Sequence, residues 1–495
     1  MAGSNTLRVC SSKPRVFIIT DIGNEPDDSE SLVRYLVYAN EFDTRGLVAC
    51  TSTHIKSSVH PEMITDILQG YAAVVNNLNR HAHPENQYPP VDELLALVST
   101  GPAVYGKMAL GPDTPLSDGA ALLIARVDES DNALWVLGWG GINTLAQAVA
   151  HVNKTKSPED AAVFRSKLRV YTISDQDDTG PWLRTLFPDI FYICSIHGWC
   201  QYFCAAWTGI SGCPEAGADP SQFTKEWLRE NIQIGPLGAK YPDAKFLVEG
   251  DSPTFLYLIQ NGLGSPEHPH WGSWGGRYSY YDESMTARHY ADAVDSAVGI
   301  DGIKYESNWA SIWKWRHAFQ NDFAARMRWT LTDDFTGANH APVVVVNGSN
   351  TGPEPFHLRV EAGETVALDA SESYDPDGDA LNFRWFQYRE PTGVAGLFTE
   401  MIPDVPITDV DVERPGTKVE VILPGPERCG IDLISGKAVK EGFEFHFVLE
   451  VTDGGTPSLT TYKRVVIRAT NKDLRGGRAT AVETNADWIE LQKGM

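Results

Sequence analysis

The chain has 495 residues, more than one hydrophobic core usually organises, so at least two domains are expected. Its composition, 42% apolar and 21% charged, is that of an ordinary folded protein and excludes a disordered chain. Acidic residues outnumber basic ones by 65 to 41, and the formal net charge of -24 repels phosphate backbones and anionic lipids. Nucleic acid and membranes are therefore not expected as partners.

Residues 13–335 alternate short apolar runs with helical patterns, which is typical of a mostly parallel sheet flanked by helices. The run Arg15–Thr20 has the continuous β-branched character of a buried strand, and residues 29–40 place leucines and valines on one helical face. Further strands are predicted at 46–52, 134–138, 168–174, 189–195 and 245–249. Ligands of parallel sheets bind beyond the carboxyl ends of the strands, so we expect these ends to converge on one crevice.

A strongly acidic loop follows the first predicted strand. The segment Thr20-Asp-Ile-Gly-Asn-Glu-Pro-Asp-Asp28 holds four acids. Carboxylates at this density repel one another unless a cation neutralises them, and hard oxygen ligands suit calcium or magnesium. The alternative is a solvated turn in which Asp28 caps the next helix. A divalent cation is the more economical interpretation.

Two other features mark the expected crevice. Asp175, Asp177 and Asp178 follow another predicted strand, where they could bind sugar hydroxyls or form a solvated turn. Aromatic residues crowd two Gly-rich segments that are expected to be loops: Trp199, Tyr202, Trp207, His270, Trp271, Trp274, Tyr278, Tyr280 and Tyr281. Large apolar rings in loops are costly unless they pack or bind ligands, and the flat faces of sugars are natural partners. By contrast, Trp309, Trp313, Trp315 and Phe319 have near-helical spacing and are expected to pack a helix.

Four of the seven cysteines, Cys194, Cys200, Cys204 and Cys213, lie close together in the sequence. One or two local disulfides, a zinc site and buried free thiols all remain open, although the spacing lacks paired Cys-x-x-Cys units.

From Val343 onward the helical pattern gives way to alternating strands separated by Gly, Pro and Asp turns, which predicts a β-sandwich domain at 341–470. Strands are predicted at 382–388, 444–451 and 463–467, and residues 471–495 form a polar tail. The turn Asp375-Pro-Asp-Gly-Asp379 resembles that of immunoglobulin-like modules of the polycystic kidney disease type. Its aspartates could bind calcium or form a plain turn.

The order of these motifs resembles the nucleoside hydrolase superfamily. Asp21, Gly23, Asp27 and Asp28 match its Asp-x-Gly-x-Asp-Asp motif, with two extra residues before the Asp pair. Three later landmarks follow in the family's order: Gly46-Leu-Val, Val136-Leu-Gly-Trp-Gly-Gly-Ile-Asn-Thr144 and Glu249-Gly-Asp-Ser-Pro253. Together with the C-terminal β domain, the chain resembles secreted microbial proteins described as cellulose-binding.

The resemblance implies a calcium (Ca2+) site and assigns roles to individual residues. Asp21, Asp28, Asp251 and the backbone carbonyl of Trp139 would bind the ion. Asp27 would hold a sugar hydroxyl, and Asp21 would also accept the proton of the attacking water.

The chain also departs from the family. Gly250 stands where many members carry a His that assists the leaving base, and Thr53 or His54 replaces a sugar-binding Asn. Glu249 could donate a proton to an alcohol leaving group, or be a surface acid at a strand end. As further contacts to the substrate we expect Asn24, His54, Asp175, Asp177, Trp207, Trp271 and Trp274.

The function predicted from these features is that of a secreted, calcium-dependent glycoside hydrolase. It would cleave an O-glycosidic bond in a plant or microbial carbohydrate through metal-activated water. A ribonucleoside N-glycosidase and a non-catalytic carbohydrate-binding protein are the alternatives. The first twelve residues lack a signal peptide's apolar core, so secretion implies a mature form. The identity of the sugar and the formation of a homo-oligomer stay open.

Overall fold

The computed structural model describes residues 4–10, 12–282, 286–348, 352–393, 399–432 and 437–471. The chain divides into two compact units. The first contains the residues up to Ile259 together with Gly272–Ala338, and the second contains Gln260–Trp271 and the residues from Asn339 onward. The short segment Gln260–Trp271 therefore leaves the first unit, although it lies inside the predicted 13–335 domain. Of the predicted tail 471–495, only Asn471 is among the described residues.

The first unit is built on an eight-stranded sheet, and every neighbouring pair is parallel except the last, β7 with β8. Its strands, in spatial order, are β3 (Val98–Thr100), β2 (Asp43–Ala49), β1 (Arg15–Thr20), β4 (Leu134–Gly138), β5 (Leu168–Thr172), β6 (Phe191–Cys194), β8 (His289–Asp292) and β7 (Tyr278–Tyr280). This confirms the predicted α/β class. Where the predicted strands ran on to residues 52, 174 and 195, the observed strands end earlier and leave those residues at the carboxyl edge.

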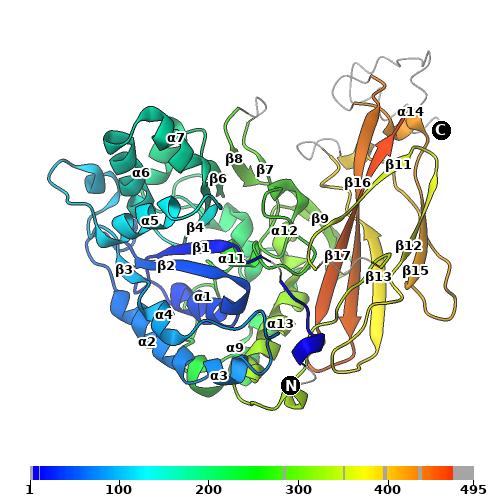
Figure 1. Cartoon of the computed structure of the whole chain (residues 1–495), viewed down its shortest axis with the longest axis horizontal. Coiled ribbons are helices and arrows are strands. Elements are labelled where there is room, and N and C mark those ends of the chain that lie inside the picture. The colour runs from blue at the N-terminus through cyan, green and yellow to red at the C-terminus, as the bar shows by residue number, and fades with distance from the viewer. Residues whose placement is uncertain are drawn as a thin grey trace. The chain divides into compact units, whose positions relative to one another are not determined.

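Helices cover both faces of this sheet (Figure 1). The helices between β1 and β4 are α1 (Asp27–Leu36), α2 (Pro61–Ala72), α3 (Val75–Leu78), α4 (Val91–Leu95) and α5 (Asp118–Asp128). After β4 come α6 (Asn143–Thr155), α7 (Pro158–Ser166), α8 (Thr179–Leu186), α9 (Lys225–Asn231), α10 (Gly235–Gly238), α11 (Pro253–Leu256), α12 (Ala310–Trp313) and α13 (Arg316–Trp329). A two-stranded antiparallel sheet joins β9 (Asp295–Val298) to β10 (Lys304–Ser307). Of the four residues predicted to pack a helix, Trp313 of α12 and Trp315 and Phe319 at the start of α13 are buried, and Trp309 is half-buried.

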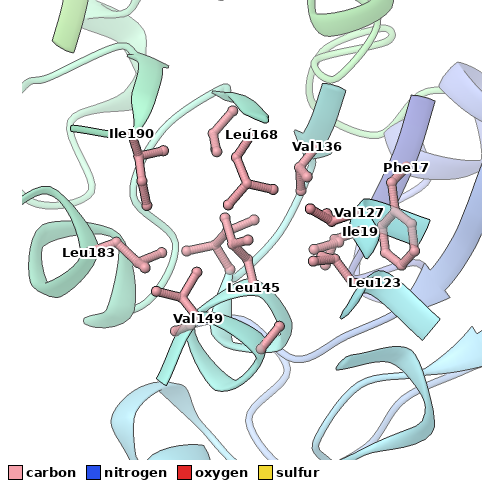
Figure 2. Packing of buried hydrophobic residues seen from close by; sticks show 14 of the residues in the cluster. Phe17, Ile19, Leu123, Val127, Val136, Leu145, Val149, Leu168, Leu183 and Ile190 are labelled. Atoms are coloured by element: carbon pink, nitrogen blue, oxygen red, sulfur yellow. The ribbon is translucent and has the colours of Figure 1, made fainter. Parts of the chain in front are cut away.

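The core of the first unit follows from the period of each element. Successive strand residues point to opposite faces, so Phe17 and Ile19 of β1 face α5, α6 and α8, whereas Ile18 faces away from them. On α6, Leu145 and Val149 are one helical turn apart and meet the strands on the same face. Figure 2 shows these side chains packed between helix and strands. This packing fixes the sheet's central strands and thereby the loops that leave them.

The strand predicted at 245–249 was wrong. Residues 245–248 form bends, and Phe246 is 79% exposed. The backbone of Val248 forms its hydrogen bonds with a side chain and not with a neighbouring strand. Its N–H donates to Ser211 Oγ at 3.0 Å, and the Ser211 hydroxyl donates to Val248 O at 2.8 Å. The place beside β6 is taken by β8, which pairs His289 with Tyr192.

The second unit is all-β, as predicted. A four-stranded sheet contains β11 (Phe356–Glu361), β17 (Thr460–Thr470), β16 (Glu441–Asp453) and β13 (Leu381–Gln387), and a three-stranded sheet contains β12 (Thr365–Asp369), β15 (Lys418–Ile422) and β14 (Ile407–Asp409). The two sheets share one core, in which Val366 and Val421 of one meet Phe445 and Ile467 of the other. A short helix, α14 (Pro426–Cys429), lies between β15 and β16. Asp375 accepts the amides of Asp377 and Asp379, which is a plain turn.

All seven cysteines are among the described residues, and all are free. The local disulfides considered for Cys194, Cys200, Cys204 and Cys213 are therefore not formed in the structure. Among the described residues, no helix has the length and apolar character that crossing a bilayer requires.

Candidate metal centre

The order of the strands locates a crevice between β1 and β4. From β1 the chain continues to β2 and β3 on one side, and from β4 it continues to β5 and β6 on the other. The loops that leave β1 and β4 therefore diverge, and open α/β sheets bind ligands at such a point. Asp21 is the first residue after β1, and Trp139 is the first after β4.

Four aspartates gather at this crevice. One carboxylate oxygen each of Asp27, Asp28 and Asp251 lie within 4.8 Å of one another, which is the one potential metal-binding group among the described residues. Asp21, Asp28 and Asp251 are buried, and Asp27 is half-buried. The hydroxyl of Thr20 donates to Asp28, but Oδ2 of Asp21 and Oδ2 of Asp251 have no hydrogen-bond partner. Buried carboxylate oxygens without donors are costly, so this donor set fits a hard divalent cation.

The electrostatics of the cluster support the same interpretation. Burial raises the pKa of Asp21 to about 6, although a hydrogen bond from Ser52 opposes the rise. Burial and the neighbouring charges of Asp21 and Glu25 raise the pKa of Asp27 to about 7. For Asp28 and Asp251, burial and repulsion from the other aspartates raise the pKa well above its usual range. A cation among these groups would remove the repulsion and keep all four ionised.

The loop after β4 fits against these carboxylates because it contains glycines. A Cβ on Gly140 would lie 2.6 Å from the Asp21 carboxyl carbon, and one on Gly141 would lie 2.7 Å from Asp177 Oδ2. The carbonyl of Trp139, the predicted backbone ligand, accepts a hydrogen bond from Gln176 Nε2 at 2.8 Å and keeps a second lone pair.

Asp177 is the one residue of the predicted 175–178 group that faces the crevice. Its Oδ1 accepts the backbone amide and the hydroxyl of Thr179, while its buried Oδ2 has no partner. Burial raises its pKa to about 6. Asp175 instead forms a two-pronged ion pair with Arg184 at 2.9 and 2.6 Å, so the structure does not support its predicted contact to substrate. Asp178 accepts the amide of Lys107 at the surface.

The structure contradicts a catalytic role for Glu249. Its carboxylate is fully buried and lies 2.7 Å from Nε of Arg34, and it accepts the hydroxyls of Tyr241 and Ser252, each at 2.8 Å. Glu249 adopts a positive φ of 56°, which turns its side chain toward α1 while Gly250 and Asp251 continue into the crevice. A carboxylate enclosed in this way has no path to a leaving group. It supports the loop that presents Asp251.

The predicted aromatic contacts divide into two groups. Trp207 is 5% exposed and lies at the crevice: a Cβ on Gly250 would be 3.0 Å from its Cζ3 and 2.9 Å from Asp27 Oδ2. Trp271 and Trp274 are both buried and covered by protein. Trp271 belongs to the second unit, where His268 stacks on it at 4.3 Å, and Trp274 packs edge-on against Phe319. The structure does not support sugar stacking by these two rings.

The remaining predicted contacts lie on the loops after β1 and β2. Asn24 is half-buried, and its backbone N–H donates to the backbone carbonyl of Asp21 at 3.3 Å. His54 is exposed, with its ring 5.9 Å from that of Tyr202.

Sequence reasoning missed three residues of this crevice. Ser52 donates to Asp21, and Ser174 forms a 2.7 Å hydrogen bond with Nε2 of His197. Ser52 and Ser174 end predicted strands, and His197 follows one. Their position at the carboxyl ends of strands was the only feature of the sequence that pointed to the crevice. Serine and histidine are too common at such positions for that signal to single them out.

Taken together, an α/β sheet with an aspartate cluster at its switch point and an all-β unit after it defines a nucleoside hydrolase-like protein with an accessory domain. The family described as cellulose-binding Sde182, nucleoside hydrolase-like domain, matches residues 15–278, and the C-terminal domain of cellulose-binding protein Sde0182 matches residues 365–469. The chain belongs to this family.

Among solved structures, the chain is similar to a nucleoside hydrolase-related hypothetical protein from Saccharophagus degradans, described as associated with carbohydrate metabolism. The two are 32% identical, with a TM-score of 0.75, over 93% of this chain and 100% of that one. An inosine-uridine preferring nucleoside hydrolase from Bacillus anthracis matches at 14% identity and a TM-score of 0.29, over 60% of this chain and 91% of that one. No curated protein matches the chain.

Proposed function

We propose that the aspartate crevice is the active site of a calcium-dependent glycosidase that acts outside the cell on an O-glycoside of a plant or microbial carbohydrate. The observation that carries the proposal is the cluster of Asp27, Asp28 and Asp251 together with the buried Asp21, in which Oδ2 of Asp21 and Oδ2 of Asp251 have no hydrogen-bond donor. The family's description as cellulose-binding, and the relative associated with carbohydrate metabolism, support a carbohydrate ligand.

Asp21, Asp28 and Asp251 would hold the cation, with the carbonyl of Trp139 beside them. The group whose oxygens lie within 4.8 Å of one another consists of Asp27, Asp28 and Asp251, and Asp21 is outside it. Asp27 is the most exposed of the three, and we assign it to a sugar hydroxyl. A bound divalent cation would supply activation of water at neutral pH and a fixed point for sugar hydroxyls.

The side chains of the crevice perform the remaining tasks. Asp21 has one carboxylate oxygen without a donor, and this oxygen can accept the proton of the attacking water. The negative charges of Asp27 and Asp177 face the sugar and stabilise positive charge that develops on the ring during cleavage. The edge of Trp207 closes the wall beside Asp27 and excludes water.

Neither position 250 nor Glu249 offers a proton donor on the leaving-group side of the crevice. Position 250 has no side chain, and Glu249 is turned into the α1 interface. Without an acid there, departure depends on the leaving group itself. We therefore expect turnover of aryl glycosides to rise steeply as the pKa of the departing phenol falls.

A panel of aryl glycosides and natural oligosaccharides, assayed beside inosine and uridine, tests the proposal. Asp21→Asn should fold normally and lose about two to four orders of magnitude in turnover, while sugar binding survives. Asp128→Asn is the matched control, because Asp128 is 45% exposed and pairs with Lys156 at the surface. Efficient cleavage of inosine or uridine without glycosidase activity would instead establish a ribonucleoside N-glycosidase.

One observation favours a second candidate, a carbohydrate-binding protein without turnover. The acid predicted to assist departure, Glu249, is committed to Arg34. Sugar binding that is not followed by cleavage of any substrate, and that is unchanged in Asp21→Asn, would support this second function.

A further inference from the structure

The loop between β6 and the short turn that carries Trp207 fixes that tryptophan through a chain of hydrogen bonds. The indole N–H of Trp207 donates to Ser174 Oγ at 3.0 Å, and Ser174 Oγ lies 2.7 Å from Nε2 of His197. His197 Nδ1 lies 2.7 Å from the carbonyl of Gly198, which can only accept, so the ring proton is on Nδ1. In the neutral imidazole, Nε2 then accepts the Ser174 hydroxyl proton. Each donor has one acceptor, and the indole is held in a single orientation.

This orientation places the far edge of Trp207 against the aspartates. A Cβ at Gly250 would lie about equally close to Trp207 Cζ3 and Asp27 Oδ2, at 3.0 and 2.9 Å. The indole is thus the inner end of an aromatic wall that faces the aspartate cluster at Asp27.

Tyr202 extends the wall outward. Its ring centroid lies 6.2 Å from that of Trp207, 5.4 Å from His197 and 5.9 Å from His54 on the loop after β2. Because Trp207 lies beside Asp27 and Tyr202 lies beside Trp207, the aromatic wall runs from the aspartates to Tyr202.

Beyond Tyr202 the same loop presents two large rings to solvent. Trp199 is 59% exposed and Phe203 is 64% exposed, on either side of Tyr202 in the sequence. Exposed aromatic rings on the loop that also supplies the crevice wall can contact the part of a ligand that extends out of the crevice. The buried carboxylates and the chain's net charge of -24 disfavour an anionic ligand. Neutral sugar units, with apolar ring faces and hydroxyl edges, match both features.

We propose that Trp199, Tyr202 and Phe203 form a second carbohydrate subsite, which holds further units of a neutral oligosaccharide whose terminal unit occupies the aspartate crevice. This inference rests on the proposed function for the position of the terminal unit. It adds that the natural ligand is a chain of at least three sugar units and not a free monosaccharide or a nucleoside.

The test measures binding without turnover. The full chain with about 10 mM calcium, roughly an order of magnitude above the dissociation constant of the weakest extracellular sites, is applied to an array of neutral and anionic oligosaccharides of one to eight units. Affinities for the bound series are then measured by calorimetry. We expect neutral chains of three or more units to bind at least about tenfold more tightly than the monosaccharide, and Trp199→Ala combined with Phe203→Ala to remove that gain. Calcium affinity should not change in the double variant.

Tyr281→Ala is the matched control. Tyr281 is 58% exposed, but it precedes β8, whose first residue pairs with Tyr192 near the start of β6, so it lies at the opposite edge of the sheet.

The subsite is refuted if affinity is independent of chain length, if the double variant keeps the gain, if anionic chains bind best, or if the array binds nothing. It is also refuted if the double variant only abolishes self-association in sedimentation. Failure of the proposed function would appear differently, as absent calcium binding or absent cleavage with the chain-length dependence intact.

Discussion

The buried ion pair between Arg34 and Glu249 provides a quantitative test of how the loop that presents Asp251 is supported. Both side chains are fully buried, and Nε of Arg34 lies 2.7 Å from Oε2 of Glu249. At an effective dielectric constant of about 20 the attraction is about 6 kcal/mol, much of which offsets the desolvation of the two charges. Removing one partner leaves the other charge buried. Arg34→Met and Glu249→Gln should therefore each lower the free energy of unfolding of the first unit by about 3–5 kcal/mol.

The double variant separates the pair from its surroundings. Because neither charge is then left uncompensated, it should cost at least about 2 kcal/mol less than the sum of the two single changes. Hydrogen exchange in peptides from α1 and α13, followed by mass spectrometry in increasing urea, reports on the first unit independently of the second. Glu249 lies two residues before Asp251, so both single variants should also weaken calcium binding. Additive effects, or single losses below about 1 kcal/mol, would show that the pair does not support the loop.

Three further predictions concern the cluster and the second unit. Asp28→Ala should abolish tight calcium binding in calorimetry, whereas Asp128→Ala should not; equal affinities would remove Asp28 from the site. The aspartates have a pKa that is higher in the folded protein than in the unfolded chain, about 6 for Asp21 and about 7 for Asp27, so the cation-free protein loses stability as pH rises from about 4 to 7. Calcium should therefore raise the unfolding temperature more at pH 8 than at pH 5, and an equal rise at both would contradict the shifts. Trp271→Ala should destabilise the second unit by about 3–5 kcal/mol, since the ring is buried against His268 and His446, and should leave sugar affinity unchanged.

The sequence predicted the parts of the site that are local. The acidic loop follows one strand, and its density of carboxylates has a direct electrostatic meaning, so the aspartate crevice could be anticipated. Glu249 could not be placed in the same way, because its role depends on Arg34 of α1, far away along the chain. A carboxylate beside the last aspartate looks like a proton donor until its partner is known.

The aromatic residues show a second limit. Trp207 and Trp271 occupy similar Gly-rich surroundings in the sequence, yet Trp207 lines the crevice and Trp271 packs in the second unit. The segment Gln260–Trp271 joins that unit through backbone contacts such as Asn261 O with Tyr462 N–H at 2.8 Å. Periodicity and composition describe a segment's own preferences, and they carry no information about which core a loop will enter.

The glycines of the crevice make one wall of the site less tolerant of substitution than the other. A methyl group at Gly140, Gly141 or Gly250 would collide with a carboxylate of the crevice, at Asp21, Asp177 and Asp27 respectively. The wall next to the aspartates therefore has no side chain at these three positions through which mutation could alter it. On the loop from residue 196 to 207, the rings of Trp199 and Phe203 are exposed to solvent and have no such constraint. Laboratory evolution toward a new sugar should accordingly accumulate substitutions on that loop while the three glycines persist.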